Sequence, residues 1–225
     1  MKLSNETLTV LKNFSTINQG IQFKQGKKLT TVSASKTVLA QANLKDEFPQ
    51  EFCIYDLNQF LSVYNLNKDC ELDFTTSDVI FKSSNGKNKS NYRMTAPDMI
   101  VTPPNKELTL PSVDCSFTLS EDDYKSIMSA ANVLSSPHIA VKSDGDTIEV
   151  VAFDAADNSA HTNSTQVGTG NGKKYSIVFK TENIKMIPGS YNVEVSFKGI
   201  GHFQNTKEDI QYWIAFEAKE SKVSE

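Results

Sequence analysis

The sequence has no long apolar run and no apolar leader. None of its hydrophobic stretches approaches the roughly 18 consecutive apolar residues that a membrane-spanning helix needs. The first four residues lead directly into a capped, amphipathic pattern, without the apolar region of a signal peptide. We therefore expect a soluble, intracellular protein without a membrane partner.

Cysteine is scarce as well. The chain has three cysteines, an odd number whose spacing matches neither a zinc site nor a disulfide framework. We expect Cys53, Cys70 and Cys115 to be reduced thiols, as in a reducing compartment. The pattern predicts no metal site.

Residues that could perform catalysis are equally few. The three histidines, His138, His161 and His202, fall on different predicted strands or turns, and none has a Cys, Asp or Glu at ligand spacing. The run from Gly168 to Lys173 looks like a phosphate loop, but it lacks the final Ser or Thr and precedes a strand, so we interpret it as a flexible hairpin. Because no nucleophile, base or metal ligands converge, the chain is predicted to be no enzyme and to need no cofactor.

The net charge of −4 excludes a uniformly basic surface of the kind that nucleic-acid-binding domains usually carry. The charge is unevenly distributed, however. Residues 1–45 contain seven lysines and one acidic residue, Glu6, whereas residues 46–225 contain 16 basic and 26 acidic residues. Any surface that faces nucleic acid must therefore be local.

What the sequence does contain is a fourfold repeat. Four times a polar cap precedes a short amphipathic run, which is followed by strand-like segments. The copies begin at residues 4–8, 55–58, 120–124 and 181–184. Since 225 residues suffice for two cores, the predicted fold class is α+β, with two pseudo-symmetric domains that each hold two helix-plus-antiparallel-strand units.

Hydrophobic spacing places the individual elements. The first helix is capped by Ser4 and stopped by Gly20, and its polar stripe consists of Asn5, Thr9, Lys12 and Thr16. Further helices are expected at 56–65, from Tyr124 to Leu134, and in a shorter form between Thr181 and the Pro188-Gly189 stop. Strands are expected at 21–23, 29–33, 37–44, 70–75, 78–82, 90–95, 138–142, 147–153, 191–197 and 212–218.

Residues 96–108 separate the second copy from the third. Three prolines in this segment disfavour helix and central strand and favour an extended chain. We predict that it connects an N-terminal domain, residues 1–108, to a C-terminal domain, residues 109–225. Met99, Ile100 and Val101 are unusually apolar for a linker, which fits either a peptide-docking surface or a seal at the domain junction.

Four segments, in the same order, resemble the DNA polymerase sliding clamps of T-even-type bacteriophages. They are LKNFSTIN at 11–18, IYDLNQFL at 54–61, VTPPNK at 101–106 and KMIPGSY at 185–191, and the similarity runs from Met1 to about Ala218. The resemblance implies a DNA-clamp fold in which three subunits close head to tail into a ring. Helices would line the hole, and sheets would form the outer wall.

The resemblance also implies a function and its partners. The homotrimeric ring would encircle double-stranded DNA without reading its sequence and would tether the replicative DNA polymerase, conferring processivity on viral DNA replication. A clamp loader and transcription factors are the further expected partners. The expected location is the cytoplasm of the infected bacterial host.

A clamp needs a positive inner wall and tolerates an acidic exterior, so the lysines on the helices become the candidates for facing DNA. Lys12, Lys125 and Lys185 are expected on the first, third and fourth helices, while Lys2, Lys24 and Lys68 lie near helix ends or adjoining turns. The second helix carries no basic residue. We therefore expect the helices to contribute unequally.

Two protein contacts follow from the resemblance. Ring closure is expected from edge strands of neighbouring subunits, residues 91–95 against a strand around 159–166, with Tyr92 or Met94 as an apolar anchor. A peptide of the polymerase or loader is expected to dock beside the connector, on Ile100, Val101 and Trp213. As a group, Tyr212, Trp213 and Phe216 suit a domain core better than a stacking platform for bases.

Two other functions stay open at this point. A β-rich phage structural or assembly protein without DNA-encircling activity would equally well carry Ser-, Thr- and Asn-rich strands and an acidic surface. A hydrolase would need a convergent acid, base or nucleophile that the sequence does not display.

Overall fold

The computed structural model describes residues 1–67, 70–106 and 108–224, so the candidate Lys68 lies outside the described residues. The chain divides into two compact units, Met1–Asn105 and Lys106–Glu225. Both units combine helical segments with antiparallel sheets, which confirms the predicted α+β class. No helix in the described ranges is long and apolar enough to cross a membrane.

The first unit opens with helix α1 (Asn5–Ile17), whose predicted cap is present: the Ser4 hydroxyl accepts the Thr7 N–H at 3.2 Å. Helix α2 (Leu57–Leu66) is capped by the Asp56 carboxylate, which accepts the Gln59 N–H at 2.9 Å. One antiparallel set of strands runs in the order β4-β1-β2-β3, and a second sheet runs β5-β6-β7. Their bounds are β1 (Ile21–Phe23), β2 (Gly26–Val32), β3 (Val38–Phe48), β4 (Phe52–Ile54), β5 (Glu71–Phe74), β6 (Asp78–Lys82) and β7 (Lys89–Arg93), followed by the 3-10 turn η1 (Pro97–Met99).

Aromatic side chains form the core of this unit. The Phe23 ring stacks on Phe52, with centroids 4.5 Å apart, and lies 4.5 Å from Phe48. Phe60 of α2 reaches both Phe23 at 6.5 Å and Phe81 of the second sheet at 5.0 Å. Because buried aromatic rings contribute large contact areas, Phe60 ties α2 to both sheets of the unit.

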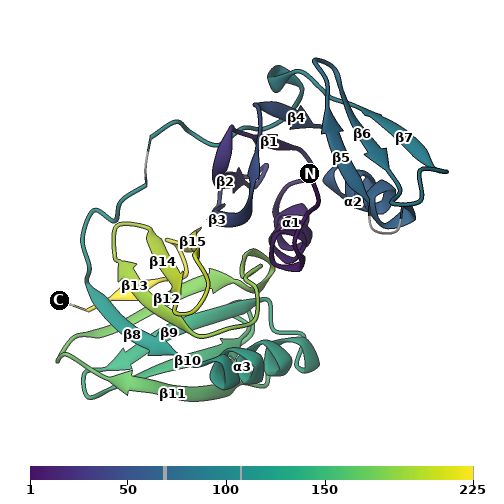
Figure 1. The fold of residues 1–225 in the computed structure, drawn as a ribbon. Helices are drawn as coiled ribbons and strands as arrows, with labels where there is room; N and C mark the ends of the chain where they lie inside the picture. The colour runs from purple at the N-terminus through teal and green to yellow at the C-terminus, as the bar shows by residue number, and fades with distance from the viewer. Residues whose placement is uncertain (68–69, 107, 225) are drawn as a thin grey trace. The chain divides into compact units, whose positions relative to one another are not determined.

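The second unit repeats the pattern with one α-helix. Helix α3 (Glu121–Val133) is capped by Ser120 and lies across strands β10 and β11 (Figure 1). One antiparallel set runs β8-β13-β14-β15, and the other sheet runs β11-β10-β9-β12-β16. The bounds are β8 (Cys115–Leu119), β9 (His138–Asp144), β10 (Thr147–Phe153), β11 (Asn163–Thr169), β12 (Lys174–Lys180), the 3-10 turn η2 (Thr181–Asn183), β13 (Tyr191–Ser196), β14 (Ile200–Asn205), β15 (Ile210–Ala215) and β16 (Lys222–Val223).

The predicted fourth helix is wrong. Residues 181–183 form only the 3-10 turn η2, and Lys185 follows it outside any helix. Other partners hold the chain here, because the Thr181 hydroxyl donates to Ser136 O at 2.8 Å and Met186 O accepts the Tyr124 hydroxyl at 2.9 Å. Ile184 and Met186 are both buried, on a stretch too short for a helix before Pro188.

The predicted hairpin at 168–173 is wrong as well. Strand β11 pairs with β10, and β12 pairs with β9, so this segment passes across the end of the β9-β10 hairpin. The Gly170 N–H donates to Asp146 O at 2.7 Å, and a Cβ at Gly170 would lie 2.2 Å from Gly145 O. Glycine is therefore required at 170 by a close approach of two backbones.

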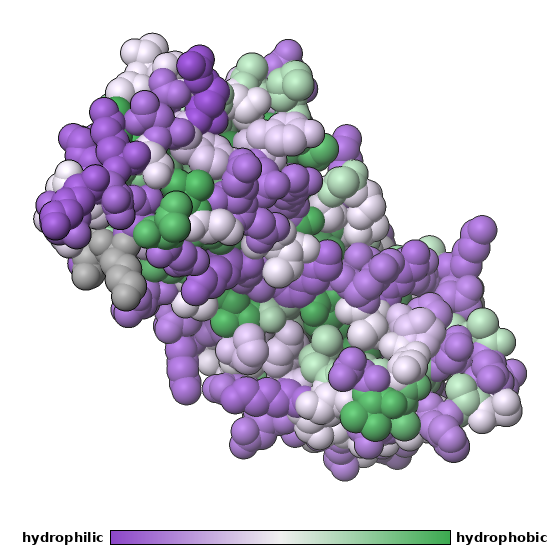
Figure 2. Space-filling model, turned by 90° about the vertical axis from the view of Figure 1, so that its right-hand side faces the viewer, coloured by the Kyte–Doolittle hydropathy of each residue, from purple (hydrophilic) through white to green (hydrophobic). Residues whose placement is uncertain are grey.

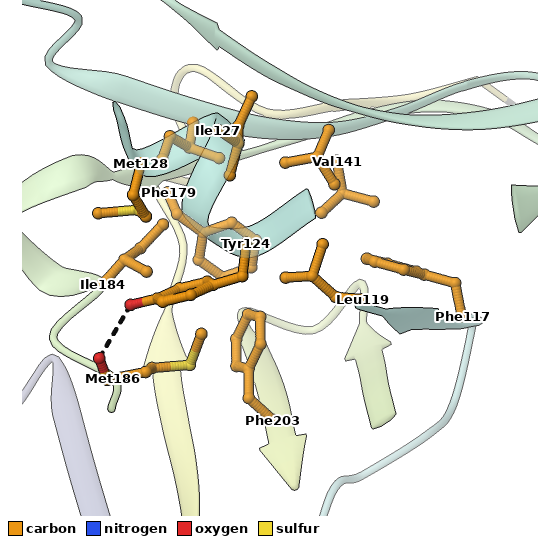
Figure 3. Close-up of a pocket in the computed structure, with 12 residues that line it drawn as sticks. Phe117, Leu119, Tyr124, Ile127, Met128, Val141, Phe179, Ile184, Met186 and Phe203 are labelled. Atoms are coloured by element: carbon orange, nitrogen blue, oxygen red, sulfur yellow. Dashed lines mark hydrogen bonds between the residues drawn. The ribbon is translucent and has the colours of Figure 1, made fainter. Parts of the chain in front are cut away.

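The core of the second unit encloses a small apolar cavity of about 30 Å³ beneath α3 (Figure 3). The Tyr124 hydroxyl, which is buried, points along this cavity to the Met186 carbonyl. Burial raises the pKa of Tyr124. The cavity is lined by Phe117, Leu119, Tyr124, Ile127, Met128, Ile139, Val141, Val150, Phe179, Ile184, Met186 and Phe203.

Replacing Tyr124 by Phe should lower the free energy of unfolding by about 1–3 kcal/mol, because the Met186 carbonyl is left buried without its donor. Urea denaturation of the full chain measures the change. Tyr55→Phe is the matched control, since Tyr55 is 56% exposed and should change stability little. An unchanged stability in Tyr124→Phe would contradict the assigned role of this bond.

Candidate nucleic-acid interface

Helix α1 presents a weakly charged polar stripe. Thr7, Leu11, Phe14 and Ile17 are buried, and the helix packs on β3 and α2. On the opposite side the Thr9 hydroxyl donates to Asn5 O at 2.9 Å, a bond back to the helix itself. Lys12 is exposed on this stripe, and no carboxylate among the described residues pairs with it. Lys12 therefore lies on the polar stripe where the sequence predicted it.

Helix α2 has an exposed face without any charge. That face consists of Asn58, Gln59, Ser62, Asn65 and Leu66. The Ser62 hydroxyl donates to Asn58 O at 2.8 Å, and Gln59 Oε1 accepts the Tyr92 hydroxyl at 3.1 Å. Amide and hydroxyl groups can contact phosphate, but they add no net attraction at long range.

Helix α3 carries one lysine, and that lysine is paired. The Lys125 Nζ lies 2.6 Å from Glu121 Oε1, one helical turn earlier. This hydrogen bond and ion pair lower the pKa of Glu121 and raise the pKa of Lys125. This pair was not predicted from the sequence, although Glu121 and Lys125 are four residues apart, a spacing at which opposite charges on a helix can pair. Lys125 therefore offers less free positive charge than its place on the polar face suggested.

The remaining lysine candidates lie outside the helices. Lys185 is exposed after η2, Lys2 is exposed before α1, and Lys24 lies in the turn between β1 and β2. The Lys24 Nζ is 3.4 Å from Asn105 Oδ1. Among the described candidates, only Lys12 and Lys125 are therefore on an α-helix.

The connector is fastened to the first unit at three points. The Ile100 side chain covers Gly20 so closely that a Cβ there would lie 2.6 Å from Ile100 Cγ2. The Asn18 amide donates to Val101 O at 3.0 Å, and Lys24 reaches Asn105. Val101 and Met99 stay exposed, at 37% and 61%. Of the predicted docking residues in this unit, Ile100 thus contacts Gly20 while Val101 remains accessible.

The third predicted docking residue, Trp213, lies on β15 of the second unit. It is only 6% exposed, and the His202 ring stacks on its indole at a centroid distance of 4.9 Å and an angle of 18°. His202 is held in turn by Gln211, with 2.9 Å between Nε2 and Oε1. A peptide could reach Trp213 only along its small exposed edge or by displacing His202.

The predicted closure segments, 91–95 and 159–166, overlap only in part with two strands that end sheets, since β7 ends at residue 93 and β11 begins at residue 163. Strand β7 ends the three-stranded sheet, and β11 ends the five-stranded sheet. On β7 the Tyr92 ring packs on Phe60 and its hydroxyl donates to Asp56 O at 2.9 Å, and burial raises its pKa. Met94 follows β7, and its N–H donates to Ser77 O at 2.9 Å. Tyr92 is thus oriented by α2 and only partly available to another molecule.

Other binding chemistry is sparse in the part of the chain that is described. No group of three or more His, Cys, Asp or Glu residues there could hold a metal ion. All three cysteines are buried as free thiols. Figure 2 shows a mainly hydrophilic face on which apolar side chains occur in small, separate patches.

Comparison with known proteins identifies relatives of this chain. The sequence model of a family described as DNA polymerase processivity factor matches residues 4–101. The sliding clamp of Vibrio phage KVP40 is 31% identical over 223 residues, which cover 97% of this chain and 100% of that protein. The sliding clamp of Enterobacteria phage T4 is 30% identical over 224 residues, which cover 97% of each chain.

Solved structures share the fold at much lower identity. Proliferating cellular nuclear antigen from Entamoeba histolytica aligns with a TM-score of 0.65 at 13% identity, covering 96% of this chain and 97% of that one. The beta clamp of H. pylori aligns with a TM-score of 0.69 at 11% identity, covering 96% of this chain and 65% of that one. These likenesses show the clamp fold, and the phage relatives show the family: this chain belongs to the sliding clamps and is a DNA polymerase processivity factor.

Proposed function

We propose that three copies of this chain close head to tail into a ring around double-stranded DNA and tether a replicative polymerase without catalysing a reaction themselves. The observation that carries the proposal is that β7 in one unit and β11 in the other each end a sheet of the described chain, so each has one side without a neighbouring strand in that sheet. Two different edges on one chain allow each copy to bind the next, and such a heterologous contact closes into a ring when the rotation permits. Near-full-length similarity to sliding clamps supports the same assembly.

The proposed grip on DNA is weak. The exposed face of α1 contributes Lys12, that of α2 contributes only uncharged groups, and Lys125 on α3 is paired with Glu121. Few free cations mean few released counterions and little resistance to movement along the duplex. Retention then depends on ring closure, because a closed ring cannot leave DNA that it encircles.

The proposed partners follow from this role. A polymerase or clamp-loader peptide would use the exposed Val101 beside Ile100 in the first unit, and Trp213 after displacement of His202 in the second. Transcription factors are further proposed partners of the ring. The proposed place of action is the cytoplasm of an infected bacterium.

The native mass tests the ring. We expect a trimer of roughly 75 kDa from a 24.9 kDa chain, in a concentration-dependent equilibrium with smaller species. Light scattering over a wide concentration range measures it. A protein that stays monomeric throughout, and fails to stimulate its own polymerase on primed circular DNA, would favour the structural-protein alternative.

Lys12→Glu combined with Lys185→Glu should impair loading or processivity and leave the trimer intact, because both lysines are exposed and proposed to face DNA. Each lost phosphate contact should reduce the slope of log K against log salt concentration by about 0.9. Binding to duplex DNA at several salt concentrations and primer extension measure the effects. Lys36→Glu with Lys198→Glu is the control for charge alone, and equal losses in both double variants would refute the assignment.

Glu121→Gln should strengthen DNA binding, since it removes the carboxylate that compensates Lys125. If Lys125 then contacts phosphate, the salt slope should become steeper by up to about 0.9. Fluorescence anisotropy with a labelled duplex at low salt measures this change. Glu47→Gln removes an exposed acid from the other unit and serves as the matched control. The same gain in both variants would point to net charge alone.

A further inference from the structure

The five-stranded sheet of the second unit has two very different edges. At one end lies β11, with the polar sequence NSTQVGT and mostly exposed side chains. Next to the other end lies β12, with the sequence KYSIVFK, in which Tyr175, Ile177, Val178 and Phe179 are buried. If the backbone N–H and C=O groups on its outer side were exposed, β12 would pair with another chain more readily than β11, because it is richer in β-branched and aromatic residues.

The backbone of β12 is covered by the segment 217–224. The Glu217 N–H donates to Val178 O at 2.7 Å, and the Ser224 N–H donates to Lys174 O at 2.9 Å. Between these points the two-residue strand β16 pairs Val223 with Tyr175 and Lys222 with Ser176. The Val178 N–H is satisfied by a side chain, the Ser221 hydroxyl, at 2.9 Å. The segment thus pairs with the backbone of β12 from Lys174 to Val178.

This covering segment contributes little to the core. Lys222 is exposed, and Val223 is 46% exposed. Phe216, just before the segment, packs edge-on against Phe179 at a centroid distance of 6.2 Å, and Lys180 Nζ lies 3.9 Å from Glu217 Oε1. The segment is therefore anchored at its start, and its remaining contacts are largely hydrogen bonds to the edge of the sheet.

The three-stranded sheet of the first unit shows the same asymmetry. At Leu72 of β5 the backbone N–H donates to Met1 O at 2.7 Å, whereas β7 ends the other side of that sheet. Each of these two sheets therefore has one edge that another segment contacts, β12 along residues 174–178 and β5 at Leu72, and one edge that ends the strand order, at β7 or β11.

We propose that residues 217–224 guard the β12 edge against pairing with a second copy of this chain, so that the β7 edge of that copy pairs with β11 and not with β12. The inference rests on the proposed ring. If β12 were open, β7 would have two possible partners on opposite sides of one sheet. Pairing through β12 would produce a different rotation between copies, and heterologous contacts that do not close grow into open chains.

The test compares native mass across variants. A chain that ends at Ala218 loses β16 and Ser221 but keeps Phe216, and it should form species larger than the wild-type assembly in a concentration-dependent manner. Full-length Lys222→Pro should do the same, because Lys222 lies opposite Ser176 in the register and proline cannot donate to a ladder. Lys222→Thr keeps the N–H group and is the matched control. Circular dichroism checks that each variant is folded.

Local exchange gives an independent readout. In Ser221→Ala the Val178 amide loses its acceptor, and its hydrogen exchange should accelerate roughly tenfold, while amides of β9 stay protected.

A synthetic peptide of residues 217–224 should reduce the excess association of the shortened chain. Wild-type mass reports on the ring itself, so a monomeric wild type would refute the proposed assembly. A trimeric wild type with equally trimeric shortened and proline variants would refute the guard alone.

Discussion

The unpaired backbone groups at the edges of β-sheets are the constraint on which the rest of this structure depends. Every edge strand exposes N–H and C=O groups that bind water, the same chain or another molecule. Here β12 is covered by residues 217–224 and β5 is met by Met1, whereas β7 and β11 end their sheets. The first unit thus has an uncovered edge at β7 and the second at β11, and the proposed heterologous contact between copies would use these two different edges.

The helices follow a second constraint under the proposed function, which is that they would face a polyanion without binding it tightly. Their buried faces are mainly apolar, but the exposed faces of α1 and α2 carry mainly amide and hydroxyl groups. Lys12 is exposed, while the charge of Lys125 is compensated by Glu121. A protein that is held on DNA by ring closure, as proposed for this chain, would need little attraction, so an overall charge of −4 is compatible with that proposal.

Much of the fold could be predicted because local signals and tertiary packing agree. The caps Ser4 and Asp56 and the alternating strands at 78–82 and 147–153 all lie where the sequence indicated. Strand β14 was missed because glycine interrupts it, and Gly201 is needed there since a Cβ would lie 2.9 Å from the Phe179 ring. That contact joins residues far apart in sequence and leaves no local signal.

The sequence by itself determined the α+β class, the repeated helix-and-strand pattern, the family and the local concentration of lysine, because periodicity, capping and charge are properties of neighbouring residues. Only the tertiary structure decided that the fourth repeat stays a 3-10 turn, since Tyr124 binds the Met186 carbonyl from another element. It also decided that His202 covers Trp213 and that residues 217–224 cover β12. These outcomes depend on hydrogen bonds and ring contacts between distant segments, which no local pattern encodes.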